Sequence, residues 1–150
     1  MEERSDWIGM IAESEGEYDH FTGFVDWGDT RGETHDAHFR LVQDEFMGRI
    51  VFWYGGTWVN GYWRSGTWRG GTWCGGTWID GEWLNGTWES GTWEDGTWHN
   101  GTWKDGTWQY GTWYKGVWES GVWNHGVQII NGYVVNRDSF PDGTLKITED

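Results

Sequence analysis

The sequence predicts an all-β protein: a β-solenoid built from five-residue repeats, with short β caps at both ends. Fourteen consecutive pentads of the form Gly-Thr-Trp-x-x run from Gly56 to His125, and a fixed period of this kind indicates a repeat architecture. Glycine tolerates positive φ and returns every five residues, so the chain is expected to bend at that interval. Thr and Trp favour extended backbone between the bends. A spacing of five matches no helical face, which excludes a helix.

The repeats divide the 150 residues into three segments. Residues 1–55 are expected to form an acidic N-terminal β segment that caps the repeats. Residues 56–125 form the pentad body. Residues 126–150 leave the pentad register and are expected to form a C-terminal hairpin cap, which would cover the open sheet edge.

Residues 1–55 contain three candidate strands, which are rich in β-branched and aromatic residues. Phe21–Trp27 is followed by a turn-rich stretch at 28–32. Ala37–Val42 and Arg49–Tyr54 are expected to be two further strands, joined through residues 43–48. The stretch Trp7–Ala12 fits either a strand or one helical turn.

Within each pentad the positions have different characters. The glycine and the tryptophan never change, and the fourth position takes many residue types, which is typical of a solvent-facing site. Core packing is therefore the favoured interpretation of the tryptophans, because large indoles must be buried or used for binding. This structural Trp ladder comprises Trp53, Trp58, Trp63, Trp68, Trp73, Trp78, Trp83, Trp88, Trp93, Trp98, Trp103, Trp108, Trp113, Trp118 and Trp123.

Two architectures satisfy a bend every five residues. In the favoured one, four pentads make a square coil of about twenty residues and coils stack ~4.8 Å apart, with Gly and Trp inward. Tyr62, Glu82 and Val122, which depart from the Gly-Thr-Trp consensus, are separated by multiples of twenty and favour this coil length. The alternative is an antiparallel zigzag of three-residue strands with a Trp row on one face, curled or closed into a shallow barrel.

Residues 126–150 contain a hairpin signal. Val127–Ile130 and Tyr133–Val135 flank Asn131-Gly132, a pair that suits a type I′ turn. The turn residues Pro141-Asp142-Gly143 are followed by a last short strand expected at Thr144–Thr148.

The charge distribution limits the classes of partner. The net charge is −14, and residues 1–55 contribute −9 of it because they hold 13 acidic and four basic side chains. Such a charge repels nucleic acid and anionic membranes, so neither is expected as a partner. No signal peptide or membrane-spanning stretch is apparent, and the single cysteine, Cys74, suits a reducing compartment. We expect a cytoplasmic protein, which includes host cytoplasm or a virion if the chain is phage-encoded.

Residues capable of catalysis are sparse. His35, Asp36 and His38 lie close together and are the weak candidates for a metal site. A polar loop in an acidic segment is the favoured interpretation, so no metal is expected. The sequence contains no nucleophile elbow, phosphate-binding loop or dinucleotide fingerprint, and neither a cofactor nor an enzymatic activity is expected. Cys74 is interpreted as an incidental thiol.

The Gly-Thr-Trp pentad resembles the pentapeptide-repeat family, whose units also contain a small, a short polar and a bulky apolar residue. The run from Trp53 to Gly61 is similar to part of a MORN repeat. The repeats resemble most the uncharacterised Trp-rich Gly-Thr-Trp proteins of tailed phages and bacteria. That resemblance implies a phage or bacterial origin and no particular activity.

The sequence thus predicts a non-enzymatic structural or protein-interaction scaffold, such as a phage virion or tail component, with protein partners or self-assembly. One alternative is an acidic DNA mimic that inhibits a DNA-binding enzyme of the host. A second is a binder of glycans or small ligands through exposed Trp.

Overall fold

The computed structural model describes residues 10–130, 132–137 and 146–147, and the described part is all-β. The long strands come first: β1 (Ile11–Ala12), β2 (Gly16–Asp26), β3 (Arg31–Asp44) and β4 (Gly48–Trp63). The pentads then form twelve two- or three-residue strands, and the chain ends in three strands of the C-terminal cap. These are β5 (Gly66–Trp68), β6 (Thr72–Trp73), β7 (Thr77–Trp78), β8 (Glu82–Trp83), β9 (Thr87–Trp88), β10 (Thr92–Trp93), β11 (Thr97–Trp98), β12 (Thr102–Trp103), β13 (Thr107–Trp108), β14 (Thr112–Trp113), β15 (Gly116–Trp118), β16 (Val122–Trp123), β17 (Gly126–Ile130), β18 (Tyr133–Arg137) and β19 (Lys146–Ile147).

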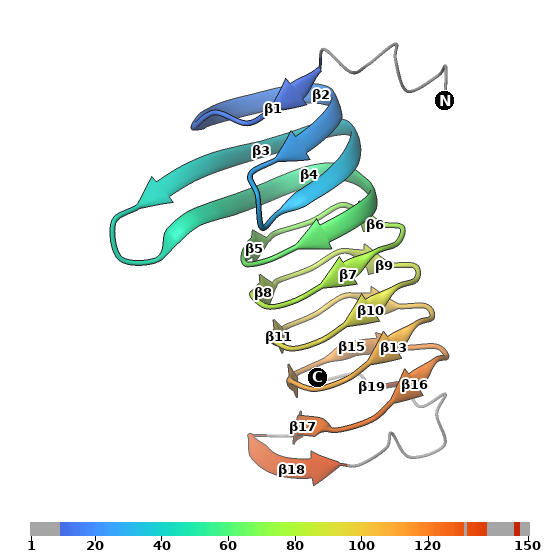
Figure 1. The fold of residues 1–150 in the computed structure, drawn as a ribbon. Coiled ribbons are helices and arrows are strands. Elements are labelled where there is room, and N and C mark those ends of the chain that lie inside the picture. Colours follow the sequence, from blue (N-terminus) through green and yellow to red (C-terminus); the bar gives the residue numbers. More distant parts are fainter. Residues whose placement is uncertain (1–9, 131, 138–145, 148–150) are drawn as a thin grey trace.

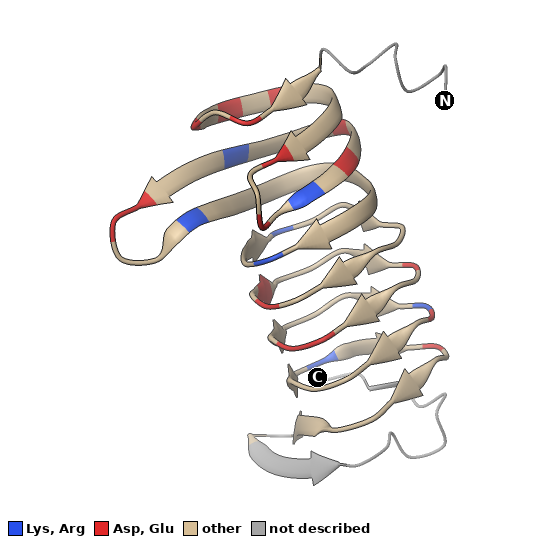
Figure 2. Cartoon of the chain, viewed as in Figure 1, with Lys and Arg blue, Asp and Glu red and all other residues tan. Residues whose placement is uncertain are grey.

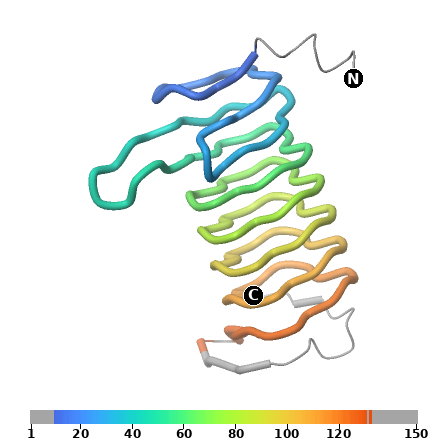
Figure 3. Tube along the Cα trace, viewed as in Figure 1, coloured from blue at the N-terminus to red at the C-terminus, as the bar shows by residue number. Residues whose placement is uncertain are grey.

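The pentads wind into a three-sided parallel β-solenoid (Figures 1 and 3). Each short strand pairs in parallel with the strand three pentads later, so Trp73 pairs with Trp88 and Trp88 with Trp103. The predicted solenoid is confirmed. The predicted square coil of twenty residues is wrong, because the register repeats every fifteen residues, and the zigzag alternative is wrong because the pentad strands are parallel.

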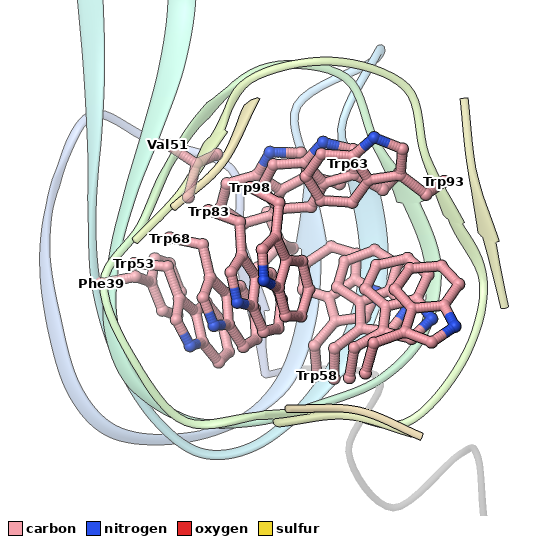
Figure 4. Close-up of a cluster of buried hydrophobic side chains, with 14 of the residues drawn as sticks. Phe39, Val51, Trp53, Trp58, Trp63, Trp68, Trp83, Trp93 and Trp98 are labelled. Carbon is pink, nitrogen blue, oxygen red and sulfur yellow. The ribbon is translucent and has the colours of Figure 1, made fainter. Parts of the chain in front are cut away.

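The core explains why three pentads close a coil. Successive indoles meet edge to face, as between Trp83 and Trp88, where ring centroids lie 5.8 Å apart at 70°. Indoles one coil apart are stacked almost parallel, as between Trp88 and Trp103 at 4.8 Å and 5°. Figure 4 shows the resulting three columns. Three bulky rings per layer fill the interior with favoured aromatic geometries, and a fourth would overfill it.

Glycine is required at each corner by the approach of neighbouring coils. Gly96 has a φ of 123°, which side chains rarely adopt. The nearest atoms to a Cβ placed there are main-chain atoms of Gly81 in the preceding coil, followed by Nε1 of Trp78. The missing Cβ of glycine thus lets the corners of neighbouring coils stack, and it also leaves room for an indole.

The solenoid begins before the expected boundary at residue 56. β4 already runs along all three sides of the first coil, pairing with β5, β6 and β7 in turn. β3 wraps antiparallel around β4, and β2 around β3, with irregular register near the corners. The expected strands at 21–27, 37–42 and 49–54 all fall within β2 to β4, apart from Trp27, and residues 11–12 of the ambiguous stretch Trp7–Ala12 are strand.

The C-terminal cap contains the expected hairpin. β17 and β18 pair antiparallel, from Ile130 opposite Tyr133 to Gly126 opposite Arg137. On its other side, β17 pairs in parallel with β14. The last strand was expected at Thr144–Thr148; its central residues, 146–147, pair antiparallel with β15. Residues 131 and 141–143, expected in turns, lie outside the described residues. No helix in the described part is long and apolar enough to cross a membrane.

Candidate functional site

The tryptophans of the ladder form the core. Trp53 to Trp118 are 0% exposed and Trp123 is 5% exposed. Trp27, which belongs to the N-terminal cap, is also buried. Every tryptophan of the described residues is buried, so none of them is exposed to bind a ligand, as the second alternative requires.

The His35–His38 cluster lies at a corner of the N-terminal cap. Nδ1 of His35 is 3.4 Å from the hydroxyl of Thr22, and Nε2 of His38 is 3.1 Å from a carboxylate oxygen of Glu17. The cluster therefore directs its side chains at separate partners. In the part of the chain that the structure describes, no three His, Cys, Asp or Glu side chains are arranged to hold a metal ion.

His20 and Asp36 form the best-defined polar contact of this corner. Nδ1 of His20 lies 2.9 Å from a carboxylate oxygen of Asp36. This hydrogen bond, with the charges of Asp19 and Asp36, raises the pKa of His20. Both residues have positive φ, 51° and 49°, because β2 and β3 turn here as Gly56 does in β4. Both side chains are largely exposed, at 82% and 63%.

On the face formed by β5, β8, β11 and β14, a column of outward side chains carries flat groups in two places, on either side of Leu84. His38 contacts Tyr54 at 4.9 Å, Arg69 lies 5.6 Å from the Tyr54 ring, and His99 stacks on Tyr114 at 5.2 Å and 1°. Most of these residues are fourth-position residues fifteen apart. The sequence reasoning missed this column because it expected twenty-residue coils.

The most prominent surface feature is a projecting hairpin, which we name the arm, comprising residues 42–50. It contains the end of β3, the turn at 45–47 and the start of β4, and it extends beyond the side of the solenoid (Figure 1). At its tip, Phe46 is 93% exposed and Met47 is 72% exposed. The turn is fixed by Asp44, whose carboxylate accepts hydrogen bonds from the main-chain N–H groups of Phe46 and Met47. These bonds lower the pKa of Asp44.

Two hollows lie where the arm leaves the solenoid. The polar hollow, of about 500 Å³, is lined on the arm by Gln43 and Arg49 and on the body by Trp27, Asp29 and Arg64. The apolar hollow, of about 420 Å³, is lined on the arm by Ile50 and on the solenoid by Phe52, Thr67 and Glu82. Met47, Ser65 and Asp80 line both hollows.

Each charged group that lines the polar hollow already has a partner within the chain. Arg49 lies 5.6 Å from the Trp27 ring and donates a hydrogen bond to its main-chain carbonyl. Arg64 is 3.9 Å from Asp29. Asp80 accepts a hydrogen bond from Gly81 N–H through one carboxylate oxygen. Phe46, Met47 and Asp80 were not singled out from the sequence, although two large apolar residues in a predicted turn are a usable signal.

Cys74 lies on a second face of the solenoid and is partly buried. Burial, and then the charge of Glu89 in the next coil, raise the pKa of its thiol. A raised pKa keeps a larger share of the thiol protonated, and the incidental role of Cys74 stays a prediction.

No known family, no curated protein and no solved structure matches the chain. The sequence resemblances to pentapeptide-repeat, MORN and phage Gly-Thr-Trp proteins stay predictions. The arm and its two hollows are therefore the candidate functional site on the basis of geometry.

Proposed function

We propose that the protein is a non-enzymatic scaffold, in which a rigid solenoid holds the arm ready to bind another protein. The observation that carries this proposal is the exposed pair Phe46 and Met47 at the tip of a hairpin that projects from a closely packed body. Exposed hydrophobic side chains and free strand edges promote aggregation. Exposed apolar side chains that are held in a well-formed turn are best explained by a partner protein that covers them.

The body has the properties of a stiff support. Along the pentads, the N–H of the second residue donates to a glycine carbonyl of the preceding coil, as from Thr92 to Gly76 at 2.9 Å. The fourth residue donates in the same way to a tryptophan carbonyl, as from Glu94 to Trp78 at 2.7 Å. Together with the indole stacks, these bonds join neighbouring coils along the body, which makes the body a stiff support.

The two alternative functions receive less support from the surface. A DNA mimic needs continuous rows of negative charge, but Figure 2 shows the coils carrying scattered charges of both signs. On the Cys74 face the carboxylates of Glu89 and Glu119 are separated by Lys104. Ligand binding through Trp lacks an exposed indole among the described residues. A role in a phage virion or tail stays a prediction from resemblance.

Site-specific photo-cross-linking tests the scaffold proposal. A photoreactive phenylalanine analogue replaces Phe46 in the arm, and a matched variant carries it at Glu94, an exposed position on the solenoid. In cells that naturally make the protein, we expect a discrete cross-linked product from position 46 and none from position 94. Equal products from both positions, or none from either, would count against binding through the arm.

A further inference from the structure

The two hollows adjoin one unpaired strand edge, where Arg49 lines the polar hollow and Ile50 lines the apolar hollow. From this arrangement we propose that the arm binds an extended segment of a partner protein as an added β-strand, whose side chains alternate between the apolar and polar hollows. This inference rests on the proposed function, since it specifies how the arm binds a protein. Strand addition uses main-chain hydrogen bonds for affinity and alternate side chains for specificity.

The free edge follows from the strand register. β4 pairs with β3 along the whole arm, from Gly48 with Asp44 onward. On its other side, β4 first meets β5 at Val51, which pairs with Gly66. Within the described residues, no strand pairs with Gly48, Arg49 or Ile50 on that side.

The main chain at this edge is oriented to accept a strand. The carbonyl of Trp53 accepts the N–H of Arg69, one coil further on, so the main-chain groups of Trp53 point away from β3. Main-chain groups two residues apart point to the same side of a strand. By this alternation Val51 and Arg49 point the same way, and Arg49 directs its N–H and C=O at the vacant position.

The side chains next to this edge sort by the same alternation. Arg49 and its cross-strand partner Gln43 lie on the side of the polar hollow. Ile50 and Phe52 lie on the side of the apolar hollow. Met47, Ser65 and Asp80 line both hollows, so the two hollows adjoin each other. The added strand would lie where they meet. Successive side chains of that strand would enter opposite hollows.

The lining also indicates the chemistry of the occupant. Met47, Ile50 and Phe52 offer an apolar wall, while Asp80 and Glu82 are the charged groups of the apolar hollow. An extended segment with β-branched apolar residues at alternate positions and a flanking Lys or Arg complements both features. A second copy of this chain is disfavoured, because each copy carries a net charge of −14.

A designed peptide tests the strand-addition mode on the full chain. The probe is a blocked peptide of about seven residues that alternates Val and Thr and ends in Lys on both sides. We expect it to slow hydrogen exchange of the Arg49 amide, and to shift the NMR signals of residues 48–52. A peptide with proline at its centre lacks the N–H and the flexibility needed, and should bind at least about tenfold more weakly.

Charge and wall variants test each hollow. Ile50→Lys places a charge in the apolar hollow and should abolish peptide-induced protection, whereas Gln109→Lys, three coils away from Arg64 along the same column, should leave it intact. Asp80→Asn combined with Glu82→Gln should weaken the Lys-ended peptide about threefold or more at low salt. Asn retains an oxygen for the Gly81 N–H, so the corner stays capped. Unchanged tryptophan emission in each variant verifies that it is folded.

The outcomes separate this inference from the scaffold proposal. Cross-linking at position 46 without peptide-induced protection of Arg49 would leave the scaffold proposal standing and overturn strand addition. Peptide protection mapped to another strand, or equal binding of the proline peptide, would also overturn it. Arm-to-arm cross-links between copies of the purified protein would show that the occupant is a second copy and contradict the partner inferred here.

Discussion

The indole Nε1–H of Trp93 donates a 3.1 Å hydrogen bond to the main-chain carbonyl of Tyr110, a residue in the next coil. The same bond links Trp98 to Lys115, and Trp103 to Ser120. Each of these indoles thus reaches the corner of the following coil, in addition to stacking on its own column. A core indole can donate this hydrogen bond to a corner carbonyl of the following coil only if one coil contains three pentads.

A disulfide test distinguishes coils of three pentads from coils of four. Trp73 pairs with Trp88, so Cys74 lies beside Glu89 in the next coil. Neighbouring strands are ~4.8 Å apart, which falls in the ~4.4–6.8 Å range of Cα separations that a disulfide spans. We expect Glu89→Cys to form a disulfide with Cys74 under mild oxidation, measured by intact mass and thiol titration. Glu94→Cys, which a coil of twenty residues would place beside Cys74, should keep two free thiols; a disulfide there would contradict the register.

Two adjacent glycines provide a matched test of the corner. The carbonyl oxygen of Gly56 occupies the space that a Cβ on Gly71 would enter, and Gly71 has a φ of 103°. Gly71→Ala should therefore lower the free energy of unfolding by at least about 1–3 kcal/mol. At Gly70 a Cβ would lie 3.5 Å from the nearest main-chain atom, the carbonyl oxygen of Tyr54. Gly70→Ala should be neutral, or stabilising by up to about 1 kcal/mol. Urea denaturation compares the two, and equal losses would mean that the corner does not select glycine.

The coil length could not be read from the sequence because a five-residue period fits any number of sides. Glycine and tryptophan predict the bend and the inward face, and both predictions hold. The separation of Tyr62 and Val122 is a multiple of both fifteen and twenty, so it could not decide between them. Glu82 favoured the wrong coil length, because it pairs with Thr67 and Thr97 and lies in a different column from Tyr62. The volume of three indoles decides the coil, and that is a property of packing.

The candidate site was less predictable than the fold. Two strands joined through residues 43–48 were expected, but the structure extends both strands into that connection and leaves only residues 45–47 for the turn. However, the hollows also depend on Arg64 and Asp80, which the fifteen-residue coil brings next to the arm. With a coil of twenty residues, other corners would have faced it. The spacing of His35, Asp36 and His38 in the sequence made them weak candidates for a metal site, but their side chains contact separate partners.

The contact between His20 and Asp36 predicts a pH-dependent signal. The hydrogen bond that His20 donates to the Asp36 carboxylate, followed by the charges of Asp19 and Asp36, raises the pKa of His20 above its ordinary value. A raised folded-state pKa means that protonation favours the folded state: the contribution is fully present below the unfolded pKa and is lost as pH rises through the folded pKa. NMR titration should show His20 titrating at lower pH in Asp36→Asn, which tolerates the same positive φ. Asp26→Asn is the control, and an equal change there would contradict a specific contact.

Removing one indole from the middle of the ladder should damage the whole body. Trp88 is 0% exposed, stacks on Trp73 and Trp103 at 4.8 Å, and meets Trp83 and Trp93 edge to face. Trp88→Ala deletes all four ring contacts and leaves a cavity, so we expect a loss of about 3–5 kcal/mol in the free energy of unfolding. Glu94→Ala, at an exposed position of the solenoid, should change it by less than about 0.5 kcal/mol.

Tryptophan fluorescence checks the premise of that prediction, first on the native protein and then on Trp88→Ala. Buried indoles stacked on one another are shielded from water, so the native protein should emit at short wavelength and resist quenching by acrylamide. In Trp88→Ala, the indoles of the coils next to the cavity should become accessible at lower urea concentration than those near the caps, because each coil is stabilised by its neighbours. Native emission at the wavelength of free tryptophan, or ready quenching, would contradict a buried ladder and with it the rigid body that supports the arm.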